Sequence, residues 1–317
     1  MFRTISIWFL IASASVPGAT AEAAGPLARG DTRVLASSAP AEEHALTQKA
    51  VELARPSGFS VTNSMVVTWV VAVGLIVFAQ AATRQMKRVP TGAQNFWEWL
   101  VESLHNFLED IIGRHLVKRT FWYFATIFIF ILAANWASLI PGVGTIGWGR
   151  SGPEGFKLEK PLFRGANADL NLTLAMALVF MACWLVWSLR EVGPIGFVKE
   201  LFAPKGDTTG FLKVLMIVVF LAAGCIEIIS ILFRPVSLSF RLYGNIFAGE
   251  KMLETMSRMI PGFGWLLPIP FYFMELLVGL VQALVFMLLC AVFTLLMCAH
   301  HEEDAPASGR DGGVSEA

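Results

Sequence analysis

Charged side chains are scarce in this sequence. Asp, Glu, Lys and Arg make up 15% of its 317 residues, against about 25% in ordinary soluble domains. The formal net charge is zero, so no basic excess favours nucleic acid as a partner. Hydrophobic residues make up 56%, and single apolar runs reach the length of a bilayer crossing. The composition excludes an ordinary soluble domain and indicates a polytopic membrane protein.

Motifs for catalysis and metal binding are also missing. The sequence has no Gly-rich phosphate loop and no HExxH pattern, which disfavours nucleotide binding and a membrane-embedded hydrolase. Its four cysteines lie in apolar segments without CxxC spacing, so they predict neither a disulfide framework nor a metal site. His300 and His301 stand in a charged tail, which we interpret as a solvated terminus. We expect no catalytic residue, no cofactor and no metal.

The first residues predict an exported N-terminus. The stretch "MFRTISIWFLIASASVPGATAEAAG" joins a basic residue, an apolar run and small residues, the pattern of a bacterial signal peptide. We assign residues 1–24 to it, with cleavage near residues 21–24; a short anchor that is never removed is the alternative. Residues 25–60 are rich in Ala, Ser, Pro and charge, which predicts a largely disordered extracytoplasmic extension.

Five apolar runs follow, at residues 65–82, 121–140, 170–189, 211–233 and 262–299. The first three are long enough to cross a hydrocarbon core of ~30 Å as simple spans. The links at 83–120 and 190–213 carry Lys and Arg, so both should face the cytoplasm, with the mature N-terminus outside and the C-terminus inside. We assign residues 61–300 to a membrane domain and 301–317 to a charged cytoplasmic tail.

Residues 93–113 predict a helix on the cytoplasmic surface. Apolar side chains recur at helical spacing in "AQNFWEWLVESLHNFLEDIIG", and acidic residues occupy other positions. The apolar stripe consists of Phe96, Leu100, Leu104, Phe107 and Leu108. A continuous apolar stripe beside several charges is typical of a helix that lies on a membrane without crossing it. We assign no chemistry to this helix.

The last two apolar segments exceed the thickness of a bilayer. Residues 211–259 are compatible with one helix apart from Pro235, and residues 262–299 follow after the turn "MIPGFGWLLPIP". At 1.5 Å per residue both helices are too long to cross upright. We expect a long tilted helical hairpin, suited to lying against a curved partner in the membrane.

An arginine interrupts the first helix of this hairpin, in "SLSFRLYGNIFAGE". A charge at the bilayer centre costs at least roughly 3 kcal/mol, so Arg241 marks a functional site. Asn245 lies four residues on and Ala248 seven, which places them on one helical stripe with Arg241. Glu250 projects from roughly the opposite face. The surface around Arg241 is expected to be thin because small residues surround it: Ser237, Ser239, Gly244, Ala248 and Gly249.

The second helix of the hairpin carries a matching polar stripe. Glu275, Gly279 and Gln282 lie at positions i, i+4 and i+7, which share a helical face. We expect Glu227 and Glu250 on one helix and Glu275 on the other to line a shared wet crevice. A simple Arg–Glu tie between helices is the structural alternative, but it explains neither the thin surface nor the excess helix length.

Four stretches resemble subunit a of the F-type ATP synthase, the stator half of its membrane motor. They are "EIISILFRPVSLSFRLYGNIFAGE", "FMELLVGLVQALVFMLLCAVFTLLM", "ADLNLTLAMAL" and "PTGAQNFWEWLVE". The resemblance covers residues 61–300 and does not extend to the N-terminal extension, the 141–166 loop or the tail. It implies an all-α polytopic protein of the bacterial inner membrane that is not itself catalytic.

The resemblance also implies partners and roles. The partners would be a rotor ring of c subunits, b-type peripheral stalk subunits, the remaining synthase subunits and the lipid bilayer. Arg241 corresponds to the stator arginine that controls the ring carboxylates, and Asn245 and Gln282 to polar residues beside it. Glu227, Glu250 and Glu275 correspond to proton-access positions in two offset half-channels. Protons are the expected ion, with sodium as the alternative because the rotor site makes that choice.

Two positions differ from or add to the family pattern, and two other functional classes compete with it. Glu250 and Glu275 occupy positions where the family varies between glutamate and histidine, so a histidine relay is not expected here. Asp169 either caps the helix that follows or lines the outer water path, and its residue type favours the cap. A secondary transporter could use a helix broken at Pro235, but the segments show no halves with matching interruptions. A passive scaffold would tolerate Arg241→Ala.

Overall fold

The computed structural model describes residues 51–54, 61–140, 146–152, 155–202, 211–259 and 266–303. The predicted signal peptide lies outside the described residues, as do most of the N-terminal extension and of the charged tail. The elements in chain order are β1 (Glu52–Ala54), β2 (Val61–Thr62), α2 (Asn63–Thr83), α3 (Ala93–Ser138), β3 (Gly147–Gly152), β4 (Gly155–Pro161), η3 (Ala166–Ala168), α4 (Leu170–Glu191), α5 (Pro194–Phe202), α6 (Phe211–Met259) and α7 (Pro268–Glu303).

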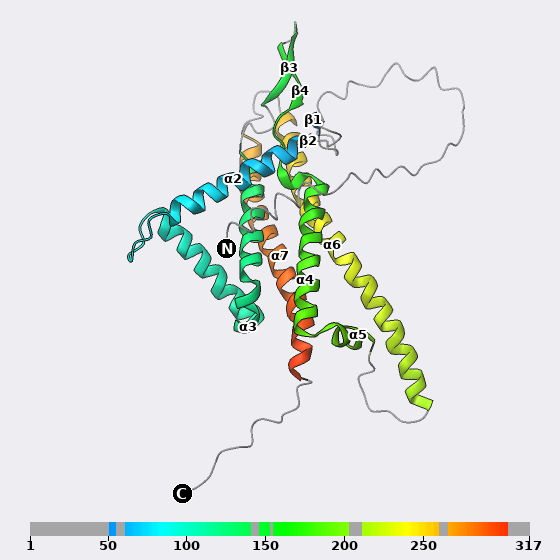
Figure 1. Ribbon diagram of the computed structural model, residues 1–317. Helices are drawn as coiled ribbons and strands as arrows, with labels where there is room; N and C mark the ends of the chain where they lie inside the picture. Colours follow the sequence, from blue (N-terminus) through cyan, green and yellow to red (C-terminus); the bar gives the residue numbers. More distant parts are fainter. Residues whose placement is uncertain are drawn as a thin grey trace, which may run out of the picture.

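The fold is that of an all-α polytopic membrane protein, as predicted. Five of the described helices, α2, α3, α4, α6 and α7, are long and apolar enough to cross a bilayer. In Figure 1 the later part of α3 stands beside α4 and α7, while α6 runs obliquely past them and its first residues diverge from the bundle. We call the end of the bundle that carries η3 and the β3–β4 hairpin the η3 end, and the opposite end the α5 end.

Helix α3 joins the predicted surface helix to the predicted second span. Its backbone leaves the helical region at Gly113, where φ is 77° and ψ is 158°. Positive φ strains any residue with a Cβ, so glycine permits this sharp change of direction. Of the predicted apolar stripe, Leu104 and Leu108 are buried within the protein, while Phe96 and Phe107 are 51% and 37% exposed. The rest of this chain therefore covers only part of the apolar stripe and leaves the two phenylalanines exposed.

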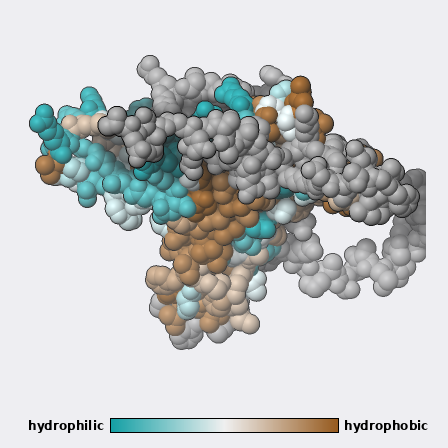
Figure 2. Space-filling model, turned by 90° about the horizontal axis from the view of Figure 1, so that it is seen from below, coloured by the Kyte–Doolittle hydropathy of each residue, from teal (hydrophilic) through white to brown (hydrophobic). Residues whose placement is uncertain are grey.

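The hydrophobic core lies between α3, α4 and α7. Phe124, Ile131, Phe180 and Met287 are almost completely buried there, and the indole N–H of Trp184 on α4 donates to the Phe293 carbonyl oxygen on α7 at 3.1 Å. Figure 2 looks at the bundle from below and shows apolar surface over its centre, with hydrophilic residues gathered on the side where α2 and α3 project. The helices thus pack through one face and leave an apolar face for lipid or partners.

Helix α6 is the least enclosed of the five spans. It is continuous over 49 residues despite Pro235, about 74 Å at 1.5 Å per residue, more than twice the ~30 Å hydrocarbon core. Only 11% of its most apolar stretch is buried, against 56% for α3. Because α6 runs obliquely past the other helices and so little of it is buried, much of its surface is open to lipid or to another chain.

Three parts of the fold were not predicted. Strands β1 and β2 pair antiparallel just before α2, although Glu52–Ala54 falls in the segment predicted to be largely disordered. The segment between α3 and α4 contains the antiparallel hairpin β3–β4 and the short helix η3, and η3 packs against α6, α2, α3 and α4. Helix α5 lies in the link before α6. The segment between α3 and α4 has functional consequences, because it carries polar side chains into the η3 end of the bundle.

Candidate functional site

Arg241 lies on the exposed face of α6, midway along a membrane span. Its side chain makes no ion pair or hydrogen bond within the part of the chain that the structure describes. Its neighbour Phe240 is 55% exposed, and Val236 one turn earlier is 37% exposed. An unpaired arginine in an apolar surface cannot face lipid at low cost. The face around Arg241 therefore fits a partner that supplies a negative charge.

The predicted polar stripe beside Arg241 is present. Ser237, Arg241, Asn245 and Ala248 are all exposed on the same face of α6, and the backbone at Gly244 is partly exposed. Ser239 and Gly249, however, are buried. The expectation that these two keep the surface around Arg241 thin is wrong, because their positions on the helix point them into the protein.

Asn245 connects the arginine stripe to α7. Its side-chain N–H donates to Gln282 Oε1 at 2.5 Å. Gln282 is 4% exposed and its Nε2 atom has no hydrogen-bond partner among the described residues. A buried amide N–H without a partner costs free energy comparable to a lost hydrogen bond. This polar pair therefore joins the exposed stripe to the interior of the helical hairpin.

Glu275 on α7 and Glu250 on α6 both lie near the η3 end, each against a glycine of another segment. Glu275 is 5% exposed, and its carboxylate lies directly against Gly249: a Cβ atom on Gly249 would collide with all three carboxylate atoms of Glu275. The Glu250 carboxylate lies against Gly165 in the same way. Glycine at these two positions leaves the space that the two acidic side chains occupy.

Glu227 does not share this crevice, contrary to our expectation. It lies 23 positions before Glu250 on α6, about 35 Å along the axis. There it forms an ion pair with Arg234 at 2.6 Å. The Arg234 guanidinium carbon stands 4.7 Å from the ring centre of Phe293 on α7, a cation–π contact that fixes the pair against the bundle. The carboxylates thus form two separate groups, one toward each end of α6.

Asp169 caps helix α4, as the sequence predicted. One of its carboxylate oxygens accepts the backbone N–H of Asn171 at 3.0 Å, and the side chain is 8% exposed. Burial raises the pKa of Asp169, while the Asn171 N–H and the positive charge of Arg164 oppose that rise. Asp169 therefore stabilises the start of α4 and also places a buried carboxyl group at the η3 end.

A chain of amide groups fixes the η3 segment to α7. Asn167 on η3 donates to Asn135 Oδ1 at 2.7 Å, and Asn135 on α3 donates to the Gly279 carbonyl oxygen at 2.9 Å. Trp136 donates to the Leu276 carbonyl oxygen at 3.2 Å. Sequence reasoning missed these residues, because nothing in their spacing predicts that three elements meet there. Their contacts set the rotation of α7 that presents Glu275 and Gln282 to α6.

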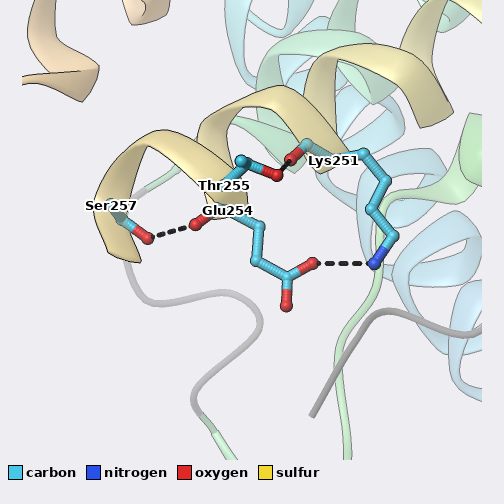
Figure 3. A network of polar contacts seen from close by, with 4 residues as sticks. All are labelled: Lys251, Glu254, Thr255 and Ser257. Carbon is cyan, nitrogen blue, oxygen red and sulfur yellow. Dashed lines mark hydrogen bonds and ion pairs between the residues drawn. The ribbon is translucent and has the colours of Figure 1, made fainter. Parts of the chain in front are cut away.

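Lys251 and Glu254, near the end of α6, form an ion pair with each other. Lys251 Nζ lies 3.1 Å from Glu254 Oε2, and Figure 3 shows this pair beside the hydroxyl contacts of Thr255 and Ser257 with helix carbonyl oxygens. Because Lys251 is engaged by Glu254, it does not neutralise its neighbour Glu250.

Arg164 is a further charged residue at the η3 end, and sequence reasoning missed it. It is 5% exposed, and its Nε and Nη2 atoms have no hydrogen-bond partner among the described residues. Its guanidinium carbon stands 5.9 Å from the ring centre of Phe247 on α6. Arg164 lies in an irregular segment outside the recognised motifs, so nothing in the sequence indicated that its side chain is buried.

Comparison with known proteins identifies the family of this chain. A family model described as ATP synthase A chain matches residues 65–294. ATP synthase subunit a of Citrifermentans bemidjiense is 32% identical over 244 residues, which cover 76% of this chain and 91% of the relative. The subunit a of Trichlorobacter lovleyi is 34% identical over 232 residues, covering 73% and 85%. A relative named "ATP synthase subunit a, sodium ion specific", from Propionigenium modestum, is 32% identical over 240 residues, covering 74% of each chain. The family model matches well over half of the chain, and the relatives are more than 30% identical over most of their own length. This chain therefore belongs to the family of ATP synthase subunit a.

Proposed function

We propose that this chain is the proton-translocating stator subunit of a rotary F-type ATP synthase in a bacterial inner membrane. The observation that carries the proposal is Arg241, an exposed and unpaired cation within an apolar membrane span. Its partner would be the carboxylates of a ring of c subunits, which pass the exposed face of α6 one after another. Catalysis of ATP formation would belong to other subunits.

Arginine suits this position because its charge does not depend on pH. A guanidinium stays protonated at any relevant pH, so it can attract a passing carboxylate into its ionised form without carrying protons itself. It would also block direct proton transfer between the two sides of the stator. Each elementary charge that crosses the membrane supplies about 2.3 kcal/mol per 100 mV, so coupling several crossings to each rotation can drive ATP formation.

The two groups of carboxylates support two offset half-channels. Glu250 and Glu275 lie toward the η3 end, and Glu227 toward the α5 end. Along α6, Glu250 is about 14 Å from Arg241 and Glu227 about 21 Å on the other side. The Glu250 carboxylate lies against Gly165, away from the exposed stripe. A proton entering through one group would therefore reach the ring on one side of Arg241 and leave on the other.

The direction of the half-channels follows from the predicted topology. Basic links before α3 and before α6 place the α5 end in the cytoplasm by the positive-inside rule. Glu250, Glu275 and Asp169 would then serve the outer path, and Glu227 the inner path. Asn245 and Gln282 would connect the outer path to the ring. The b-type stalk subunits would hold the chain against rotation.

The proposal is tested with membranes that contain the assembled complex. Arg241→Ala should abolish both ATP-driven proton pumping and ATP synthesis while subunit a remains in the complex. Arg114→Ala is the matched control: it removes one guanidinium whose ion pair with Glu109, at 2.7 Å, lies on the surface helix, where such pairs contribute little. Coupled transport at a near-native rate in Arg241→Ala would refute the proposal and leave a passive scaffold as the better interpretation.

A further inference from the structure

The η3 end contains a buried cation that the proposed mechanism does not yet use. Arg164 is 5% exposed, and two of its guanidinium nitrogens have no hydrogen-bond partner in the part of the chain that is described. Removing an ion from water costs several kcal/mol unless charges or hydrogen bonds compensate it. Arg164 therefore needs partners that its own segment does not provide.

Two acidic side chains lie near Arg164 without forming a direct ion pair with it among the described residues. The positive charge of Arg164 acts on both Asp169 and Glu250. Gly165, the next residue along the chain, touches the Glu250 carboxylate, and the Arg164 guanidinium lies beside Phe247, one turn before Glu250 on α6. The Oε2 atom of Glu250 is shielded from solvent and lacks a hydrogen-bond partner. Unmatched donors and an unmatched acceptor thus lie in one buried region.

No other described cation compensates Glu250. Lys251 is engaged by Glu254 (Figure 3), and the other charges that act on Glu250 are the like charges of Glu275 and Glu254. The neighbouring ends of α2 and α3 contribute uncharged polar groups, including Asn63 and Asn135. Among the described residues, Arg164 is therefore the opposite charge that acts on Glu250 and on Asp169.

We propose that Arg164 is a positioning residue of the outer half-channel, holding Glu250 and Asp169 around one buried guanidinium, with water completing the contacts. Buried water with two or more polar partners is a regular part of protein structure. The fixed positive charge would keep these acids able to release protons, and would make sodium ions less favourable at the same place. This inference rests on the proposed function and names a regulator of the same path.

The test compares Arg164→Gln, which removes the charge, with Arg164→Lys, which keeps it. Passive proton flux through the membrane sector, with the catalytic sector stripped off, is measured against the pH on the outer side. Loss of a nearby opposite charge makes a carboxyl group hold its proton more tightly, so the half-maximal pH of Arg164→Gln should rise by roughly one unit. Arg164→Lys should restore most of the native profile. An unchanged profile in Arg164→Gln would overturn the inference.

A second variant separates positioning from a merely structural role. If Arg164 acts through Glu250, adding Arg164→Gln to Glu250→Gln should produce little further shift, because interacting residues are not additive. A shift that persists in full would refute the inference. If Arg164→Gln fails to assemble, the double variant should assemble, since it removes both charges together; failure of both would also count against the pairing. Arg241→Ala is measured in parallel and tests the proposed function separately: coupled transport that survives in Arg241→Ala refutes the proposed function, whatever the Arg164 variants show.

Discussion

Substituting Gly249 by alanine tests whether the close packing of the hairpin matters for transport. The new Cβ atom would overlap the Glu275 carboxylate, which is buried between α6 and α7. Helix α6 cannot move away locally without shifting the Asn245–Gln282 hydrogen bond one turn earlier. Overpacking of this kind typically costs 1–3 kcal/mol. If transport requires Glu275 to stay in its present position, the same 1–3 kcal/mol is added to the barrier for transport. Proton flux should then fall by about 5- to 160-fold.

The assay is ATP-driven proton pumping into membrane vesicles, normalised to the amount of assembled complex. Gly74→Ala is the matched control, because a Cβ atom on Gly74 in α2 meets no atom within 4 Å and alanine favours a helix. A compensating variant, Gly249→Ala with Glu275→Asp, shortens the acidic side chain by one methylene and should recover part of the flux. Native pumping by Gly249→Ala would refute the argument that Glu275 requires this space.

Three further predictions concern other parts of the fold. Asp169→Asn should keep the level of subunit a in the membrane, because asparagine also caps helices, whereas Asp169→Ala should lower it by the loss of about 1 kcal/mol; equal levels on immunoblots would contradict the cap. Asn245→Ala and Gln282→Ala should be non-additive by about 0.5–1.5 kcal/mol in a double-mutant cycle on the pumping rate, and additive effects would show that their hydrogen bond is irrelevant to transport. Gly113→Ala should destabilise the bend in α3 by about 1 kcal/mol, measured as faster proteolysis of the complex, and unchanged proteolysis would contradict a strained position.

The polar residues of α6 show how far helical periodicity can be trusted. Periodicity alone placed Arg241, Asn245 and Ala248 on one face and Glu250 on another, and the structure agrees because α6 remains continuous through Pro235. The same reasoning grouped Gly249 and Ser239 with the thin surface, although both are buried. Small residues favour close approach on any face, so composition identified close packing without saying which helix approaches.

The carboxylates show a second limit. Glu227 and Glu250 belong to one helix, and a sequence does not reveal that oblique packing turns α6 into two separate sites. The pairing of Glu227 with Arg234 follows from their spacing of seven residues, but the contact of Arg234 with Phe293 depends on how α7 stands beside α6. Glu227 therefore lies toward the opposite end of α6 and not in the crevice that the sequence predicted.

The sequence by itself determined the membrane class and the five apolar helices, and it predicted the surface helix and the role of Arg241, because hydrophobic runs and helical periodicity are local properties of the chain. Only the tertiary structure decided which groups meet at the η3 end. There an irregular segment brings Arg164 and Asp169 to α6, and asparagines on α3 and η3 fix the orientation of α7. Burial and electrostatic pairing between segments a hundred residues apart depend on packing, and no local pattern encodes them.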